Sequence, residues 1–163
     1  MFLPTILSSA LVFFVALAGV NAEKHVVEFE NKCGHGTPKL VSQNGKVLSN
    51  GGKYTHQGSL VGAIAFLQTG NCDANGGGCL FVETTLQNPD PNAPGSGSST
   101  DLSLIPPHKF SVKTGFHYFN GCDGKGKVCA GQKCKTAFHK DTDTQVQVAC
   151  QKKNVDLRIT FCG

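Results

Sequence analysis

The chain has 163 residues, of which 39% are hydrophobic and 16% charged, and its formal net charge is +4. It contains eight Cys, 20 Gly and no Trp. This composition excludes a collagen-like chain, a coiled coil and a membrane-spanning protein, and the short blocks of Val, Leu, Ile and Phe argue against intrinsic disorder.

The first 22 residues have the pattern of a secretory signal peptide. The apolar run from Ile6 to Val20 is too short to span a bilayer, and Val20-Asn21-Ala22 is a small-x-small cleavage pattern. We therefore expect a signal peptide over residues 1–22 and a secreted protein, extracellular or in a cell wall, that starts at Glu23. Because no Lys or Arg precedes the cleavage pattern, an uncleaved anchor remains the alternative.

The remainder, residues 23–163, is long enough for one domain and too short for two ordinary ones. Apolar and polar residues alternate with period two in many short segments, which predicts half-buried β-strands separated by Gly, Pro and Asn turns. An all-β fold, a single disulfide-linked β-sandwich, is therefore expected. The expected strands are His25–Asn31, Lys39–Ser42, Lys46–Leu48, Lys53–His56, Leu60–Leu67, Cys79–Leu86, Leu102–Ile105, Phe110–Tyr118, Gln145–Cys150 and Val155–Phe161.

A stretch rich in Pro, Gly and Ser, Asn88 to Thr100, interrupts these strands and is interpreted as a mobile surface loop. The chain has no Asn-x-Ser/Thr sequon, so the cluster Ser96–Thr100 is the candidate glycan carrier, by O-linkage.

The even number of cysteines, together with the signal pattern, predicts four disulfides in an oxidising compartment. A zinc site at Cys129, Cys134 and His139 is the weaker alternative, because their spacing is unlike that of structural zinc sites. A glycine turn separates Cys72 from Cys79 and favours a local bridge between them. A bridge between the outermost cysteines would close almost the whole secreted chain and stabilise it most. The eight cysteines are Cys33, Cys72, Cys79, Cys122, Cys129, Cys134, Cys150 and Cys162.

The basic residues are concentrated in the second half of the chain, where a run of lysines has Asp123 as its nearby opposing charge. They fit either an anionic partner or solvated loops that keep a small domain soluble. Nucleic acid is not expected as a partner, because aromatic residues are not interleaved with the lysines. The lysines are Lys109, Lys113, Lys125, Lys127, Lys133, Lys135 and Lys140.

Four segments in chain order resemble the thaumatin-like protein family, in its shortened eight-cysteine form. The resemblance implies a flattened β-sandwich that largely lacks the family's second disulfide-rich domain. It also implies the pairs Cys33–Cys162, Cys72–Cys79, Cys122–Cys150 and Cys129–Cys134. The four segments are Val27–Cys33, Thr69–Cys72, Asp101–Ile105 with the following strand to Cys122, and Val155–Cys162.

The resemblance further implies binding, and in some members slow hydrolysis, of β-1,3-glucan in an acidic cleft, with an antifungal or wall-remodelling role. Glu83 matches the family's Glu and Asp101 its first Asp, but the Arg and the other two Asp have no counterpart. A pair of carboxylates is what a glycosidase needs. With part of the cleft missing, we expect binding more than catalysis, and at most weak endo-β-1,3-glucanase activity.

Sugar binding also requires an exposed aromatic ring on which a sugar can stack. We expect Tyr118 to provide it, which makes Tyr118 a ligand-binding candidate together with Glu83 and Asp101. Phe119 and His117 have the opposite parity and are candidates for the outward face. The competing hypothesis is an interaction protein, an effector or inhibitor of a foreign enzyme, that binds an extracellular protein through loops such as Asn88–Thr100 or Gly124–Gly131. No cofactor or metal is expected, and the protein is expected to be a monomer.

Overall fold

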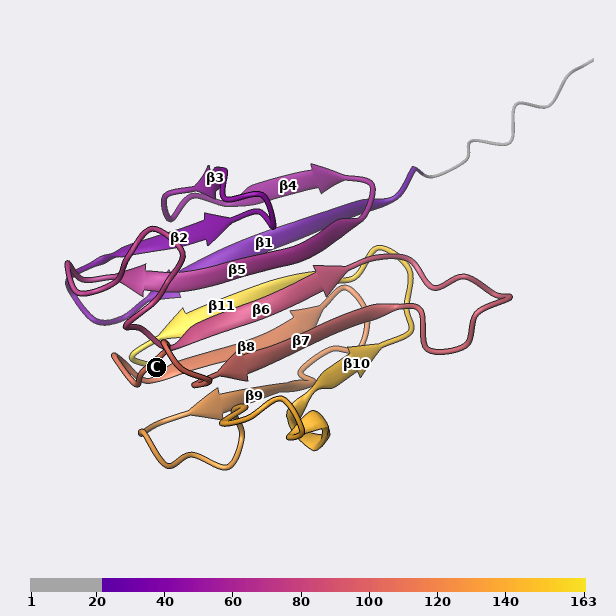
Figure 1. Ribbon diagram of the computed structural model, residues 1–163. Coiled ribbons are helices and arrows are strands. Elements are labelled where there is room, and N and C mark those ends of the chain that lie inside the picture. Colours follow the sequence, from indigo (N-terminus) through magenta and orange to yellow (C-terminus); the bar gives the residue numbers. More distant parts are fainter. Residues whose placement is uncertain (1–21) are drawn as a thin grey trace, which may run out of the picture.

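The computed structural model describes residues 22–163, so the signal peptide expected over residues 1–22 lies outside the described residues except for Ala22. Within that range the chain is all-β, with a single 3-10 turn, η1, at Thr144–Val146 (Figure 1). None of the described residues forms a helix long and apolar enough to cross a membrane. The strands are β1 Lys24–Asn31, β2 Thr37–Val41, β3 Val47–Ser49, β4 Tyr54–Gln57, β5 Leu60–Gln68, β6 Phe81–Leu86, β7 Ser98–Ser103, β8 Thr114–Phe119, β9 Gly126–Cys129, β10 Val148–Cys150 and β11 Asp156–Phe161.

The strands form two sheets that pack face to face as layers (Figure 1). One has five strands in the order β4-β1-β11-β8-β9, and the other has six in the order β10-β7-β6-β5-β2-β3. The first and last strands, β1 and β11, are parallel neighbours in the centre of the five-stranded sheet, whereas the other pairs are antiparallel. Pairing of the first strand with the last closes the described chain into one unit.

Alternation of side chains decides which face of each strand is buried. In β11 Leu157, Ile159 and Phe161 are fully buried, and in β6 Val82 and Leu86 are fully buried, and all five belong to one core between the sheets. Removing such apolar surface from water contributes about 25 cal/mol per Å². In β11 the intervening Arg158 and Thr160 are partly exposed, whereas Thr84 of β6 is buried on the core side with its hydroxyl group 2.6 Å from that of Thr100.

Four disulfides lie at the ends of strands, and they are the four expected pairs. The bridge between Cys33 and Cys162, whose Cα atoms are 5.1 Å apart, ties the ends of β1 and β11 together. The other three fix loops after β5, β8 and β9. They are Cys72–Cys79, Cys122–Cys150 and Cys129–Cys134.

The expected loop Asn88–Thr100 is too long, because its last residues belong to β7. Ser98 and Thr100 are buried, with Thr100 Oγ1 2.6 Å from Thr84 Oγ1. The interpretation of Ser96–Thr100 as a glycan carrier is therefore wrong for Ser98 and Thr100, which no enzyme can reach in the folded chain. The sequence did not indicate this part of β7, because its buried side chains are hydroxyl groups that hydrogen-bond to one another and so do not give the apolar–polar alternation of an ordinary strand.

The expected strand Gln145–Cys150 is wrong in its first half, because Thr144–Val146 forms the turn η1 and β10 starts only at Val148. Two further predictions also need correction. The expected strand Phe110–Tyr118 starts only at Thr114, and the glycine-rich segment Gly124–Gly131 contains the unpredicted strand β9. Gly126 lies so close to β8 that a Cβ atom there would be 1.8 Å from the carbonyl oxygen of Phe116. Gly126, which in the sequence indicated a turn, is therefore the residue that allows the edge strand β9 to pair closely with β8.

Candidate functional site

Glu83 and Asp101 face each other on the outer face of the six-stranded sheet. They are direct partners in the antiparallel register of β6 and β7. Their neighbours Val82 and Leu102, also partners, are fully buried in the core, so the two carboxylates project from the opposite face. Directly opposed residues have Cβ atoms about 4.5 to 5.5 Å apart. The two candidates that the sequence places 18 positions apart are thus brought together by strand pairing.

The two carboxyl groups occupy different environments. Glu83 is exposed, whereas Asp101 retains only 6% of its accessible surface. Burial and, to a smaller extent, the negative charge of Glu83 raise the pKa of Asp101 to about 7, although a hydrogen bond from the Gln147 side chain opposes both effects. Around neutral pH the pair therefore holds one exposed acceptor and one carboxyl group that is partly protonated and able to donate.

Gln147 was not recognised from the sequence as part of this site. It directly follows the turn η1 and precedes β10, the edge strand next to β7. The sequence predicted a strand over Gln145–Cys150, in which Gln147 would be one surface residue among several. Only the pairing of β10 with β7 brings its amide to Asp101.

A small apolar cluster on the outer face lies beside the acidic pair. Val41, Phe66 and Phe81 are buried there, with Ile64 packed against them, and Ile64 is the register partner of Glu83 on β5. A hollow of about 440 Å³ begins at Ile64 and is lined by polar groups. The hollow gives a ligand that contacts Glu83 room to extend along the sheet. Its other lining residues are Ser42, Gln43, Asn44, Gly45, Gly62 and Asn75.

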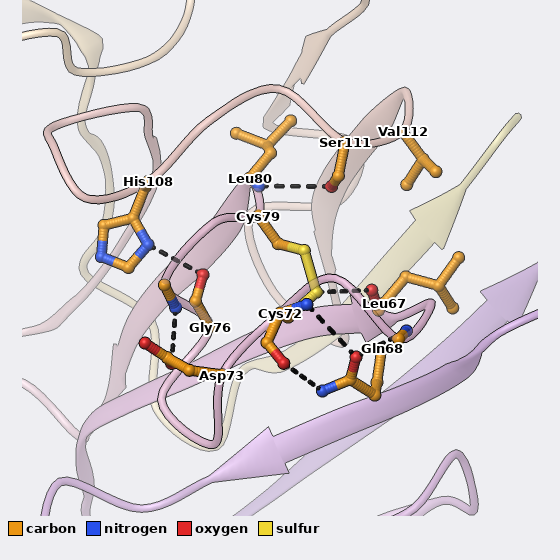
Figure 2. Close-up of a disulfide and its surroundings, with 12 residues drawn as sticks. Leu67, Gln68, Cys72, Asp73, Gly76, Cys79, Leu80, His108, Ser111 and Val112 are labelled. Carbon is orange, nitrogen blue, oxygen red and sulfur yellow. Dashed lines mark hydrogen bonds between the residues drawn. A yellow bond between two sulfur atoms is a disulfide. The ribbon is translucent and has the colours of Figure 1, made fainter.

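The loop between Cys72 and Cys79, drawn in Figure 2, packs on this apolar cluster through Cys72 and Gly76. A Cβ atom at Gly76 would lie 2.9 Å from the ring of Phe66, so only glycine allows the loop to pack this closely. The carbonyl oxygen of Gly76 accepts a hydrogen bond from His108 Nδ1 at 3.0 Å, and the His108 ring packs edge-on against Phe81, with centroids 4.0 Å apart. The loop is therefore held in place over the apolar cluster.

Tyr118 does not belong to the site, and its assignment as a ligand-binding residue is wrong. Its side chain is fully buried between the sheets, and its hydroxyl oxygen lies 2.9 Å from both Thr100 Oγ1 and the carbonyl oxygen of Val148. Burial raises the pKa of Tyr118 to about 12. Alternation along β8 explains the placement, because Phe116 and Tyr118 point inward while His117 and Phe119 are partly exposed.

The acidic pair is not part of a larger cluster of metal ligands. Among residues 22–163, no group of three or more His, Cys, Asp or Glu side chains is placed to hold a metal ion. The nearest aromatic rings by register, Phe66 and Phe81, are buried. The chemistry of the site is therefore that of two carboxyl groups, one amide and the polar edge of the neighbouring hollow.

Comparisons with known proteins place few constraints on this site. No family model matches the chain, and no curated protein is significantly similar to it in sequence. Among solved structures, it is similar to the protein elicitor MoHrip2 from Magnaporthe oryzae, with 12% identity and a TM-score of 0.46. The match covers 87% of this chain and 100% of that chain.

Proposed function

We propose that the protein is a secreted thaumatin-like protein that binds β-1,3-glucan, or a related cell-wall polysaccharide, on the outer face of the six-stranded sheet. The observation that carries this proposal is the direct pairing of Glu83 with Asp101. The four disulfide pairs and the two packed sheets also support it. An antifungal or wall-remodelling role follows if the polymer belongs to a fungal wall.

The two carboxyl groups offer a sugar chain complementary contacts. The exposed Glu83 carboxylate accepts hydrogen bonds from sugar hydroxyls, and charge-assisted hydrogen bonds of this kind are roughly twice as strong as neutral ones. Asp101 in its protonated form donates to a ring or glycosidic oxygen. The hollow beside Ile64 accommodates the next sugar along the chain. Because the nearest rings are buried, stacking contributes little, and binding relies on repeated hydrogen bonds along a polymer.

Hydrolysis would use the same two groups with divided roles. Asp101 would act as the general acid and Glu83 as the nucleophile or the base that activates water. Glu83 faces solvent, however, and water weakens the electrostatic stabilisation of a developing charge. We therefore expect slow endo-hydrolysis at most, confined to pH values below about 7, where Asp101 is protonated.

Sedimentation with insoluble β-1,3-glucan tests the proposal. The variants are Glu83→Gln and Asp101→Asn, and Glu30→Gln is the matched control, because Glu30 is an exposed carboxylate on the other sheet. We expect Glu83→Gln to weaken retention at least tenfold, since loss of a charged hydrogen bond costs about 1.5 to 3 kcal/mol. The control should bind as the wild type does. Absence of retention, or equal retention by all four proteins, would refute the site.

One observation favours the second candidate, an interaction protein without catalytic activity. The loop between β6 and β7 projects from one end of the sandwich (Figure 1). It is held by its own turns, in which Ala93 N donates to the Asp90 carbonyl and Ser96 N to the Ala93 carbonyl, both at 3.1 Å. A preordered loop loses less conformational entropy on binding an extracellular protein. This candidate gains support if glucan is not retained.

A further inference from the structure

A second hollow, of about 550 Å³, lies on the opposite side of the molecule, on the outer face of the five-stranded sheet. Its floor lies across three neighbouring strands. Asp156 of β11 is the register partner of Phe119 of β8, and on the other side of β11 it lies next to Val26 of β1, one residue before the pair Val27–Leu157. The volume falls in the range of about 300 to 1,000 Å³ that small-molecule sites occupy. This surface is separate from Glu83 and Asp101, which lie on the other sheet.

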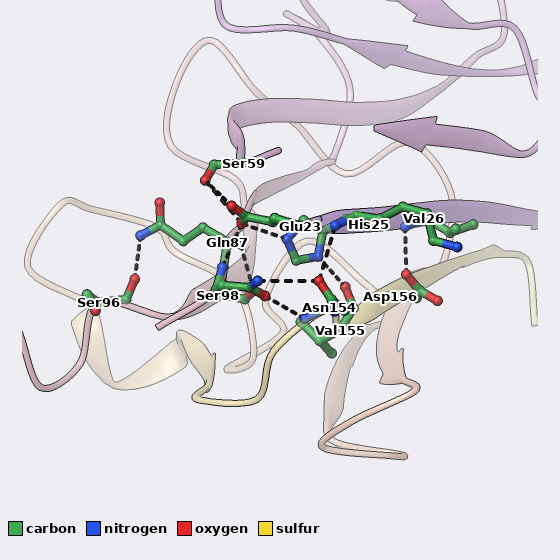
Figure 3. Close-up of polar contacts among 12 residues, drawn as sticks. Glu23, His25, Val26, Ser59, Gln87, Ser96, Ser98, Asn154, Val155 and Asp156 are labelled. Atoms are coloured by element: carbon green, nitrogen blue, oxygen red, sulfur yellow. Dashed lines mark hydrogen bonds and ion pairs between the residues drawn. The ribbon is translucent and has the colours of Figure 1, made fainter. Parts of the chain in front are cut away.

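The floor of this hollow is rigid. Asp156 retains 5% of its accessible surface, and its Oδ1 accepts a hydrogen bond from the backbone N of Val26 at 2.7 Å (Figure 3). Its Oδ2 accepts a second one, at 2.5 Å, from Nδ2 of Asn120. The guanidinium carbon of Arg158 sits 5.4 Å from the centroid of the Phe119 ring, which fixes the ring by a cation–π contact. A ligand would therefore meet a preformed surface.

The polar groups that remain available at the rim are mainly donors. Both oxygens of Asp156 already accept hydrogen bonds from the protein. Lys24 and Gln57 are exposed at the rim, and Lys24 has no ion-pair partner among residues 22–163. Lys53 also lines the hollow, where it pairs with Glu28 at 3.0 Å, and Glu28 is shared with Arg158 at 2.9 Å. Of the charged residues that line the hollow, Lys24 and Lys53 are cations and Asp156 is a carboxylate, which leaves one uncompensated positive charge.

We infer that this hollow binds a carboxylated sugar, a uronate residue of an extracellular polysaccharide. The partly exposed ring of Phe119 offers an apolar surface to the C–H face of the sugar ring. Lys24 binds the sugar carboxylate, and the Gln57 amide and Asn120 carbonyl oxygen bind hydroxyl groups. A neutral sugar would leave the excess positive charge unpaired, so charge is the basis of selectivity. The inference goes beyond the proposed glucan site, because it concerns another sheet and another ligand charge.

Cleavage after Ala22, expected from the sequence, would strengthen this site. Ala22 lines the hollow, so its removal opens the rim and leaves the ammonium group of Glu23 nearby. Glu23 itself is anchored, because its carboxylate accepts hydrogen bonds from Asn88 N at 2.7 Å and Ser59 Oγ at 3.1 Å and lies 3.0 Å from His25 Nε2 (Figure 3). The new positive charge would therefore be held in place beside the sugar carboxylate.

Calorimetric titration of the secreted, disulfide-intact protein with trigalacturonate tests the inference, with neutral galactotriose as the comparison ligand. We expect Lys24→Gln to weaken trigalacturonate binding about tenfold and Phe119→Ala at least tenfold, and we expect affinity to fall as salt rises. Lys133→Gln, which removes an exposed lysine from the Cys129–Cys134 loop, should bind as the wild type does.

Several results would overturn the site. These are no binding of trigalacturonate, equal affinity for galactotriose, or equal weakening by Lys133→Gln. Loss of trigalacturonate binding on Glu83→Gln would place the ligand on the other sheet and would also reject the inference. If Phe119→Ala fails to fold, Lys24→Gln and Gln57→Ala test the site instead, because both residues are exposed and their replacement should leave the fold intact. Failure here leaves the glucan experiment unaffected, since its variants lie on the six-stranded sheet.

Discussion

Asp101 and Glu28 are carboxylates on the outer faces of opposite sheets, and their surroundings drive their pKa values in opposite directions. Asp101 is buried next to Glu83, so its pKa rises to about 7. Glu28 accepts hydrogen bonds from Arg158 and Lys53, which lower its pKa below the usual range despite partial burial. The first residue can exchange a proton near neutral pH, whereas the second serves as a permanent counter-charge between two cations.

The raised pKa of Asp101 predicts a pH-dependent stability. Between about pH 4 and pH 7 the folded state binds this proton and the unfolded state does not, so the free energy of unfolding should fall as pH rises, by at most about 1.4 kcal/mol per pH unit. Asp101→Asn should remove this slope. Urea unfolding across that window measures it, with Asp90→Asn, in an exposed loop, as the control. Parallel curves for wild type and Asp101→Asn would contradict the assignment.

At the scale of elements, β9 shows how a glycine-rich segment becomes an edge strand. It pairs with β8 in the register Gly115 to Val128 and His117 to Gly126. Cys129, its last residue, is bonded to Cys134, so the strand is held by backbone hydrogen bonds at one end and by a covalent loop at the other. Its existence depends on the absence of a side chain at position 126.

Gly126→Ala should therefore detach β9 from β8. The added Cβ would overlap the Phe116 carbonyl oxygen, a backbone atom that cannot rotate away, and overpacking of this kind costs about 1 to 3 kcal/mol. Hydrogen exchange should accelerate at the amides of β9, and the urea midpoint should fall. Gly131→Ala is the matched control, because a Cβ atom at that position would meet no other atom within 4 Å. Unchanged exchange in β9 would rule out this explanation of the close strand pairing.

At the scale of the whole molecule, parallel pairing places the first strand, β1, beside the last strand, β11. The register runs from Val27 with Leu157 to Asn31 with Phe161, and the Cys33–Cys162 bridge follows directly. This bridge spans 129 residues, whereas Cys129–Cys134 spans five. In the chain-entropy model the longer closure removes more freedom from the unfolded state.

Removing the Cys33–Cys162 bridge should therefore lower the free energy of unfolding more than removing the Cys129–Cys134 bridge. Replacing Cys33 and Cys162 together with Ser should lower the free energy of unfolding by about 5 kcal/mol, and replacing Cys129 and Cys134 by about 2 kcal/mol. Guanidinium unfolding of both double variants gives the comparison. If the short-loop variant were the less stable of the two, closure of the chain would not be the main stabilising constraint.

Strands with regularly alternating apolar and polar side chains were predictable from the order of the residues alone. The strands β1 and β11 start and end within one residue of their predicted limits, since each has one apolar and one polar face. The expectation of an all-β chain with four disulfides was also correct. Glu83 and Asp101 were named as candidates from the sequence, although their distance apart was unknown.

Strand pairing, and the residues that cover each outward side chain, follow from contacts between distant parts of the chain. Register places Glu83 opposite Asp101, and the edge strand β10 brings Gln147 to that pair. Packing buries Tyr118 and leaves Phe119 at the floor of a polar hollow. Alternation fixes the two faces of a strand, but burial and pKa depend on neighbours from distant parts of the chain. Those contacts form only when the two sheets close on each other.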